Sequence, residues 1–256
     1  FNYFFGYICK LLINVFVIYD FLNIKMEFIK KYTQAHPHLV AVDCIVFGFD
    51  NEDLKILLIK RPIEPIKGQW SLMGGFVQEG ESLDEASKRV LYMLTGLTNV
   101  YLEQLYTFGD IDRDPVARVI SVAYYALIKI KDYDEKIVKN NSAEWFKVSN
   151  YPKLIFDHET MVQTAINKLR RKCRTQPIGF ELLPEKFTIP QLQSLYEAIL
   201  MQKLDKRNFR KKILSMNLLD KLSEKDKGNS KKGAYLYKFN KEKYEILTSK
   251  GFSFEI

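Results

Sequence analysis

The first regular pattern along the chain is a pair of apolar runs separated by a short polar segment. Residues 38–49 and 54–60 are rich in Val, Ile, Leu and Phe, and the polar residues 50–53 lie between them. Such runs predict two buried strands joined by a turn. Residues 100–108 and 116–130 are also β-branched and aromatic, and they predict two further strands.

Between these strands, residues 82–96 change to a helical spacing of apolar side chains. Ser82 is a good N-cap, and Glu85 three positions later completes a capping box. Gly96 is placed to end the helix in a left-handed conformation. The apolar stripe consists of Leu83, Ala86, Val90, Met93, Leu94 and Leu97. We expect this stripe to be buried in a core or an interface.

A second region with a different pattern begins after a helix predicted over residues 159–173. Residues 174–187 contain two prolines and a glycine together with several apolar side chains, which indicates an ordered linker. Residues 188–201 and 205–216 then follow as two helices joined by a short turn.

A hairpin is predicted next, with strands at 218–222 and 234–239 and a polar, glycine-bearing tip at 223–233. The chain is therefore expected to be an α+β protein with one domain at 26–173, a linker at 174–187 and a second domain at 188–256.

Residues 1–25 differ in composition from the rest of the chain. Phe, Tyr, Ile, Asn, Lys and Leu dominate them, which AT-rich codons supply, and Met26 follows directly. The apolar run 3–19 contains Lys10 and Asn14 and is shorter than the about 20 residues that a spanning helix needs. We interpret residues 1–25 as a non-native upstream extension; the alternatives are a membrane anchor, an interfacial helix or a structured N-terminal element.

The charge of the chain is concentrated in the second domain. The 256 residues carry a net charge of +8, and residues 205–238 contain eleven Lys or Arg against four Asp or Glu. This local surplus indicates an anionic partner. The three cysteines, Cys9, Cys44 and Cys173, match no zinc spacing, so we expect no metal and a reducing, cytoplasmic location. We also expect no cofactor and no membrane partner.

Two helices, a tight turn and a hairpin with a basic tip are the elements of a winged helix-turn-helix, in which the second helix enters the DNA major groove and the wing contacts phosphates. Arg and Asn side chains can make bidentate contacts to guanine and adenine. The predicted DNA-binding residues are Lys206, Arg207, Asn208, Arg210 and Lys211 on the helix and Lys225, Lys227, Lys231 and Lys232 on the wing. The alternatives are a solvated basic surface, an RNA-binding module or a protein-docking domain.

The stretch 75–97 keeps the spacing of a known motif but not its chemistry. Gly75, Glu81, Arg89 and Gly96 fall at positions that resemble the Nudix box of enzymes that cleave nucleoside diphosphates linked to another moiety. The three metal-binding glutamates of that motif are replaced by Val90, Met93 and Leu94. Apolar side chains cannot hold Mg²⁺, which takes oxygen ligands. We therefore predict that the chain is not an enzyme and that it has neither catalytic residues nor metal ligands.

A loop at residues 109–115 combines three aspartates and an arginine, with Arg118 just beyond. Carboxylates and guanidinium groups can make paired hydrogen bonds to a polyhydroxylated ligand, although a solvated turn is an equal alternative. The candidate effector-binding residues are Trp70, Glu81, Asp110, Asp112, Arg113 and Arg118.

A degenerate Nudix domain joined to a C-terminal winged helix resembles the Nudix-related transcriptional regulators over residues 36–245. Segments 70–77, 111–115, 154–158 and 205–212 resemble the arabinose-regulator branch of Bacteroidetes. The resemblance implies a Nudix-type α/β/α sandwich with a mixed sheet, a winged helix-turn-helix domain, and a homodimeric repressor. It further implies that a pentose such as L-arabinose weakens binding to the double-stranded DNA operator.

Two other interpretations stay open. A sister branch of the same family responds to ADP-ribose and controls NAD metabolism, so the effector can be ADP-ribose. The chain can also be a divergent Nudix hydrolase of a nucleoside diphosphate derivative, with metal held by Glu79, Glu81 and Glu85.

Overall fold

The computed structural model describes residues 36–98, 100–130, 142–227 and 233–256. All the helices and strands discussed below lie within Leu39–Ile256, which is one compact unit. The interpretation of residues 1–25 as an upstream extension lies outside the described residues, as do wing residues Lys231 and Lys232.

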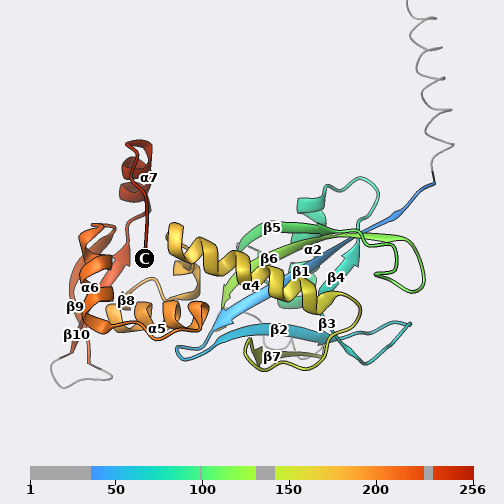
Figure 1. Cartoon of the computed structure of the whole chain (residues 1–256), viewed down its shortest axis with the longest axis horizontal. Coiled ribbons are helices and arrows are strands. Elements are labelled where there is room, and N and C mark those ends of the chain that lie inside the picture. Colours follow the sequence, from blue (N-terminus) through green and yellow to red (C-terminus); the bar gives the residue numbers. More distant parts are fainter. Residues whose placement is uncertain (1–35, 99, 131–141, 228–232) are drawn as a thin grey trace, which may run out of the picture. The chain divides into compact units, whose positions relative to one another are not determined.

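A seven-stranded mixed sheet forms the first domain (Figure 1). Its path runs β3-β2-β1-β6-β5, while β4 pairs with β1 and β7 pairs with β2. The long strands β1 and β6 are parallel over eleven residue pairs, from Leu39↔Val119 to Phe49↔Lys129, and the other pairings are antiparallel. The strands are β1 (Leu39–Phe49), β2 (Leu54–Lys60), β3 (Trp70–Ser71), β4 (Met73–Phe76), β5 (Tyr101–Phe108), β6 (Val119–Lys129) and β7 (Ala143–Lys147).

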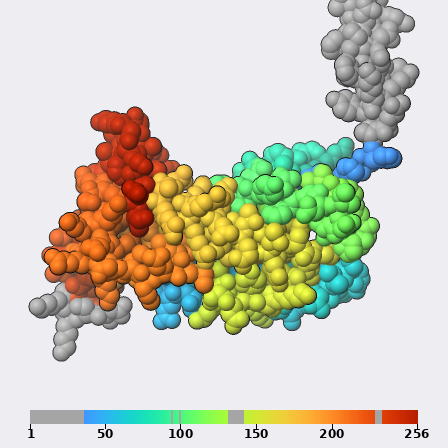
Figure 2. Space-filling model, viewed as in Figure 1, coloured from blue at the N-terminus to red at the C-terminus, as the bar shows by residue number. Residues whose placement is uncertain are grey.

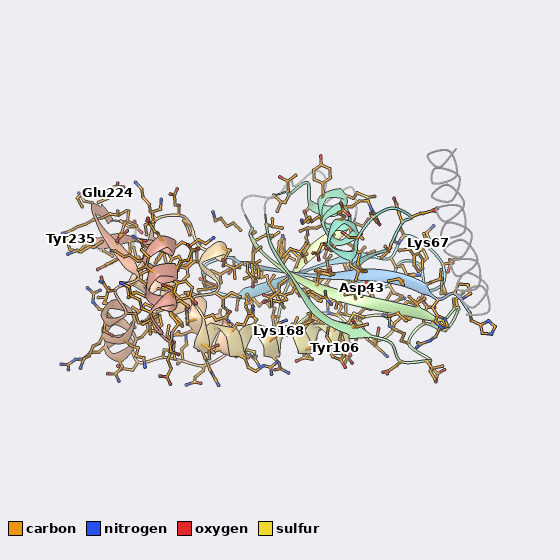
Figure 3. The ribbon with its side chains drawn as sticks, turned by 90° about the horizontal axis from the view of Figure 1, so that it is seen from above. Asp43, Lys67, Tyr106, Lys168, Glu224 and Tyr235 are labelled. Atoms are coloured by element: carbon orange, nitrogen blue, oxygen red, sulfur yellow. The ribbon has the colours of Figure 1, made fainter. Side chains whose placement is uncertain are left out.

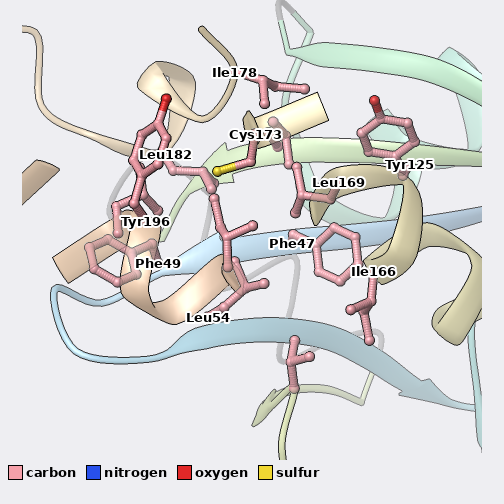
Figure 4. Packing of buried hydrophobic residues seen from close by; sticks show 14 of the residues in the cluster. Phe47, Phe49, Leu54, Tyr125, Ile166, Leu169, Cys173, Ile178, Leu182 and Tyr196 are labelled. Atoms are coloured by element: carbon pink, nitrogen blue, oxygen red, sulfur yellow. The ribbon is translucent and has the colours of Figure 1, made fainter. Parts of the chain in front are cut away.

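Strand β1 supplies both faces of the sheet because alternate side chains point to opposite sides. Val42, Cys44 and Val46 belong to one core with residues of helix α2 (Leu83–Thr95). Ile45, Phe47 and Phe49 belong to the other core, which includes residues of helix α4 (His158–Thr175), as Figure 4 shows. The predicted α/β/α sandwich with a mixed sheet is confirmed.

The local signals of α2 act as predicted. Ser82 accepts from the backbone N–H of Glu85, and the Glu85 carboxylate accepts from the backbone N–H of Ser82 at 2.8 Å. Gly96 ends the helix with φ +75°. A cap of this kind contributes about 1 kcal/mol, so the helix is stabilised independently of any metal.

The segment 174–187 packs apolar side chains into the protein. Residues Phe180–Leu182 form a short 3₁₀ helix, and the side chains of Ile178, Leu182 and Leu183 are buried. They belong to the same apolar cluster as α4 and the first helix of the second domain. The two domains therefore share a continuous core.

The second domain has the winged-helix elements in the predicted order. Helices α5 (Ile189–Leu200) and α6 (Lys206–Ser215) precede a three-stranded sheet of order β8-β10-β9. Its strands are β8 (Phe187–Thr188), β9 (Leu219–Asp226) and β10 (Ala234–Phe239).

Strand β9 is longer than predicted, because Tyr235 and Ala234 continue the antiparallel pairing out to Lys225 and Asp226. A final helix, α7 (Lys241–Ser249), was not predicted. Its signal is Asn240, which caps it by accepting from the Lys243 N–H at 2.8 Å. Among the described residues, no helix is both long enough and apolar enough to cross a membrane.

Tyr196 of α5 is fully buried, and its hydroxyl has no hydrogen-bond partner among the described residues (Figure 4). Burial also raises its pKa well above the usual value. An unpaired buried hydroxyl costs about 1–3 kcal/mol. We expect Tyr196→Phe to raise the free energy of unfolding by about 1 kcal/mol in denaturant titration.

Tyr125→Phe is the matched comparison, because the Tyr125 hydroxyl donates to the Glu103 carboxylate at 2.9 Å. This substitution is expected to lower the free energy of unfolding by about 1 kcal/mol. Equal effects of the two substitutions would contradict the account.

Candidate functional site

A cavity of about 380 Å³ opens beside strand β1 and the N-terminal part of the box. We call it the Asp43 cavity. Its walls come from β1, the end of β2, β4, helix α2, the loop before β6 and the start of α4. The residues discussed below that line it are Asp43, Arg61, Gly74, Arg89, Val90, Met93, Arg113, Phe156 and His158.

Glycine at position 74 leaves room for a carboxylate in this cavity. A Cβ atom at Gly74 would lie 2.2 Å from Asp43 Oδ1, which is far inside contact distance. The close approach of Asp43 therefore explains why position 74 carries glycine, without reference to a metal. Another cavity, of about 510 Å³, lies between the β1–β2 turn and the end of α5, but it has no buried charged residue in its lining.

The box helix presents apolar side chains to the Asp43 cavity. Val90 is 4% exposed and packs in the α2 core, in agreement with prediction. Met93 also lines the cavity but is 60% exposed, so of the two expected settings, a core or an interface, it does not lie in the core. The helix buries Leu91 and Thr95 instead, because its inner face is rotated toward them. The side chain of Leu94 lies outside the described part of the chain.

Buried charges converge at the inner end of the cavity. The Asp43 carboxylate accepts from the Ser121 hydroxyl at 2.5 Å and lies 3.9 Å from Arg113 Nη2. Arg113 also makes a two-pronged pair with Asp157, from Nε at 2.9 Å and Nη2 at 2.8 Å. The Arg113 side chain is only 4% exposed, so these contacts replace its hydration.

His158 completes this cluster as a neutral side chain. Its Nδ1 accepts from the backbone N–H of Leu72 at 3.1 Å, which places the ring proton on Nε2, 3.9 Å from Asp43 Oδ1. Burial lowers the pKa of His158 below its usual value, and Arg113 and Arg61 act in the same direction. Asp43 and Asp157 oppose the shift without cancelling it.

Glu81 is held by the arginine of the box. Arg89 donates to its two carboxylate oxygens at 2.9 and 2.6 Å, and the backbone N–H of Gln78 donates at 2.7 Å. These bonds, those of Arg89 first, lower the pKa of Glu81 to about 2. Glu85 serves the capping box. Within the described part of the chain, no group of three His, Cys, Asp or Glu residues could hold a metal ion.

Of the six candidate effector residues, Arg113 lines the Asp43 cavity and the other five do not. Trp70 packs edge-on against Phe146, with ring centroids 4.8 Å apart. Arg118 donates to the carbonyl of Asp110 at 2.9 Å, and Asp112 is exposed in the same loop. The loop is therefore stabilised by contacts among its own residues, and its Arg113 side chain faces the cavity.

The effector residues predicted from the sequence do not include Asp43, Arg61, Asp157 or His158. A usable signal existed for Asp43, because a carboxylate inside an apolar strand needs compensation. For Arg61, Asp157 and His158, no local pattern indicates that they meet, since this depends on how β2 and α4 cross the end of the sheet.

Helix α6 presents a basic outer face. Asp205 caps it by accepting from the Asn208 N–H at 2.8 Å, and Phe209 and Ile213 are its buried residues. The predicted DNA-binding side chains Lys206, Arg207, Asn208, Arg210 and Lys211 are all exposed. The wing residues Lys225 and Lys227 are exposed as well.

The hairpin carries a basic cluster that sequence reasoning did not single out in full. Lys221 Nζ lies 3.8 Å and Lys225 Nζ 4.5 Å from the centroid of the Tyr235 ring, which is labelled on the hairpin in Figure 3. Such cation–π contacts restrict where the two ammonium groups point. Tyr235 is partly exposed, so the cluster is available to a partner.

The fold and these two sites define a class of protein: a sandwich domain with an arginine-lined cavity, followed by a winged helix with a basic outer face. Comparisons with known proteins agree with this class. The domain described as NUDIX matches residues 37–165, and the NrtR DNA-binding winged helix domain matches residues 179–239. The chain belongs to the NrtR family of Nudix-related transcriptional regulators.

The relatives differ in how much of the chain they cover. The "ADPR responsive transcriptional repressor NtrR" of Acinetobacter baylyi is 35% identical over 228 residues, which are 87% of this chain and 91% of that protein. The crystal structure of Shewanella oneidensis NrtR complexed with a 27mer DNA matches with a TM-score of 0.72 and 29% identity, over 78% of this chain and 93% of that one. An ADP-ribose pyrophosphatase of Methanocaldococcus jannaschii is 40% identical over 144 residues, 55% of this chain and 80% of that protein.

The lowered pKa of His158 makes stability depend on pH. Because the folded state binds the proton less readily than the unfolded state, stability is complete above about pH 6.5 and falls as the pH drops below that value. In urea titrations at pH 7.5 and 5.5, we expect His158→Asn to lose less stability on acidification than the unchanged protein. Asn keeps an acceptor for the Leu72 N–H. An unchanged pH dependence in the variant would contradict this assignment.

The hairpin cluster predicts a salt effect on DNA binding. If Lys221 and Lys225 each neutralise one phosphate, replacing either with Ala should reduce the slope of log affinity against log salt by about 1 and weaken binding to all sequences similarly. Lys88→Ala removes the same charge from the exposed side of α2 and is the control. Equal slopes for Lys88→Ala and Lys221→Ala would contradict a role for the cluster.

Proposed function

We propose that this chain is a transcriptional repressor that binds an operator through its winged helix and releases it when ADP-ribose occupies the Asp43 cavity. In this proposal residues 26–173 bind the effector, residues 188–256 bind DNA, and the ordered linker 174–187 joins them. The repressor acts as a homodimer, whose two winged helices match two operator half-sites.

The observation that carries the proposal is the charge of the cavity wall. Arg61, Arg89 and Arg113 line it, and Arg61 is paired with no carboxylate among the described side chains. Its Nε donates to the carbonyls of Ile63 and Pro65, and its guanidinium lies 5.3 Å from the Phe156 ring centroid. The two terminal nitrogens of Arg61 are thus available to an anion such as a pyrophosphate.

This chemistry favours ADP-ribose over the pentose that the resemblance to arabinose regulators implied. A neutral sugar gives an uncompensated arginine no charge partner, whereas the two phosphates of ADP-ribose do. The Acinetobacter baylyi relative is itself named for its response to ADP-ribose. We therefore place L-arabinose second as effector.

We further propose that the cavity binds its ligand without hydrolysing it. Val90 and Met93 face the cavity where the Nudix box supplies glutamates, and neither can coordinate Mg²⁺. The similarity to an ADP-ribose pyrophosphatase keeps a hydrolase as the second candidate. Release of products from ADP-ribose that depends on Mg²⁺ and reaches multiple turnovers would favour the hydrolase.

The test uses the full chain and a duplex selected from a random DNA pool. Operator affinity is measured with increasing ADP-ribose, L-arabinose or another pentose. We expect saturating ADP-ribose to weaken operator binding by about 5–150-fold, the range of ordinary allosteric coupling, and the sugars to have no effect. Release by L-arabinose alone would reverse the choice of effector, and no selected sequence would overturn the DNA-binding proposal.

Arg61→Ala should raise the Kd for ADP-ribose at least about tenfold in calorimetry, because a hydrogen bond to a charged group contributes about 1.5–3 kcal/mol. Lys67→Ala is the control, since Lys67 is an exposed cation of the same loop that does not line the cavity (Figure 3). Operator affinity without effector should be unchanged in both variants. Equal loss of ADP-ribose affinity in both would show that the loop acts only through its general charge.

A further inference from the structure

We propose that helix α4 transmits occupancy of the Asp43 cavity to the winged helix, with the Arg113–Asp157 pair as its ligand-sensitive end and Arg170 as its attachment to the second domain. The inference rests on the proposed function, because it explains how a bound anion changes operator affinity. A ligand can act only if it binds one of two conformations of the protein more tightly. Helix α4 therefore needs a contact at one end that the ligand changes and a contact at the other end that moves the second domain.

The first end lies in the wall of the cavity. Asp157 occupies the N-cap position of α4, yet its side chain makes no cap hydrogen bond, because both carboxylate oxygens accept from Arg113. Phe156, just before it, has φ +47°, an unfavourable backbone conformation for a non-glycine residue. The uncapped start of α4, next to a strained residue, is thus held by this ion pair together with the hydrogen bond from the Leu72 N–H to His158.

That ion pair is exposed to competition from a ligand. Arg113 lines the cavity, and its partner Asp157 is 20% exposed. An anion bound by Arg61 in the same cavity would compete with Asp157 for the Arg113 guanidinium, since one planar guanidinium offers a limited set of directed donors. Occupancy of the cavity would then release the start of α4.

The body of α4 is suited to pass on a displacement. It is one continuous helix of 18 residues, with Val162, Ala165, Ile166 and Leu169 buried along one side. Its outer side is on the surface, where it forms the yellow-gold band in Figure 2. Packed helices shift as units, because interiors have little free volume to absorb a local change.

The second end is joined to the winged helix. Arg170 Nε donates to the Ile199 carbonyl at 3.1 Å, and its guanidinium also contacts the sulfur of Met201, the residue that ends α5. From α5, Glu197 accepts from the Leu204 N–H at 3.0 Å and Gln193 donates to the Leu204 carbonyl at 2.9 Å. Leu204 directly precedes Asp205, the cap of α6, so the contacts run on to the proposed DNA-reading helix.

Arg170 is thus a positioning residue for regulation that touches neither ligand. The quantity to measure is the coupling factor, which is the operator Kd with saturating ADP-ribose divided by the operator Kd without it. We expect Arg170→Met to reduce this factor to within about twofold of 1, from the usual 5–150-fold. Its Kd for ADP-ribose is expected to stay unchanged, because Arg170 lies outside the cavity.

Two further variants make the test specific. Arg171→Met is the matched control: Arg171 is the next residue of the same helix and is exposed, with no side-chain partner among the described residues, and it should keep full coupling. Asp157→Asn should weaken operator binding without any ligand, as ADP-ribose does in the unchanged protein. In the double variant with Arg170→Met, Asp157→Asn should no longer weaken operator binding, because the contacts of Arg170 with Ile199 and Met201 are already lost.

The outcomes separate this proposal from the proposed function. Full coupling in Arg170→Met, with normal thermal unfolding, would overturn the role of α4 while leaving ADP-ribose as effector. Equal loss of coupling in Arg171→Met would also overturn it. If ADP-ribose does not bind the unchanged protein, the proposed function fails first. If Asp157→Asn does not fold, the comparison of Arg170→Met with Arg171→Met still decides.

Discussion

The burial of one carboxylate orders the first domain. Asp43 lies in the middle of the apolar strand β1, where an isolated charge would cost several kcal/mol. Its charge is met by the hydroxyl of Ser121 on the parallel neighbour β6 and by Arg113 from the preceding loop, and the neutral ring of His158 from α4 lies 3.9 Å away. The charge thus fixes where the loop enters β6 and where α4 begins, and these are the walls of the cavity.

The box helix is held by local contacts that do not involve a metal. Its start is fixed by Ser82 and Glu85 and its end by Gly96, and none of these residues needs a metal. Glu81 and Arg89 hold each other, which fastens the loop before the helix to its outer side. Because stability comes from caps and packing, Val90 and Met93 are free to shape a binding surface.

The sequence predicted most elements of the fold because their signals are local. Strand β2 and the returning strand β10 have the predicted bounds, and the capping box of α2 is the one expected from Ser82 and Glu85. The exposed basic face of α6 followed from helical spacing. The cavity could not be predicted, because Asp43, Arg61 and His158 meet only through the crossing of separate elements. Met93 lies outside the core, because apolar character alone does not say which side of a helix is inside.

The tight approach of Gly74 to Asp43 bears on how such a protein can evolve. A Cβ at position 74 would collide with the carboxylate, so this position is fixed as long as Asp43 stays. The next residue, Gly75, is also closely packed. A Cβ atom at Gly75 would lie 3.0 Å from Cγ2 of Val90, which is almost fully buried. A glutamate at position 90 would place a second, largely buried carboxylate in the wall of the Asp43 cavity. The carboxylate that builds the cavity therefore also limits which side chains its neighbours can carry.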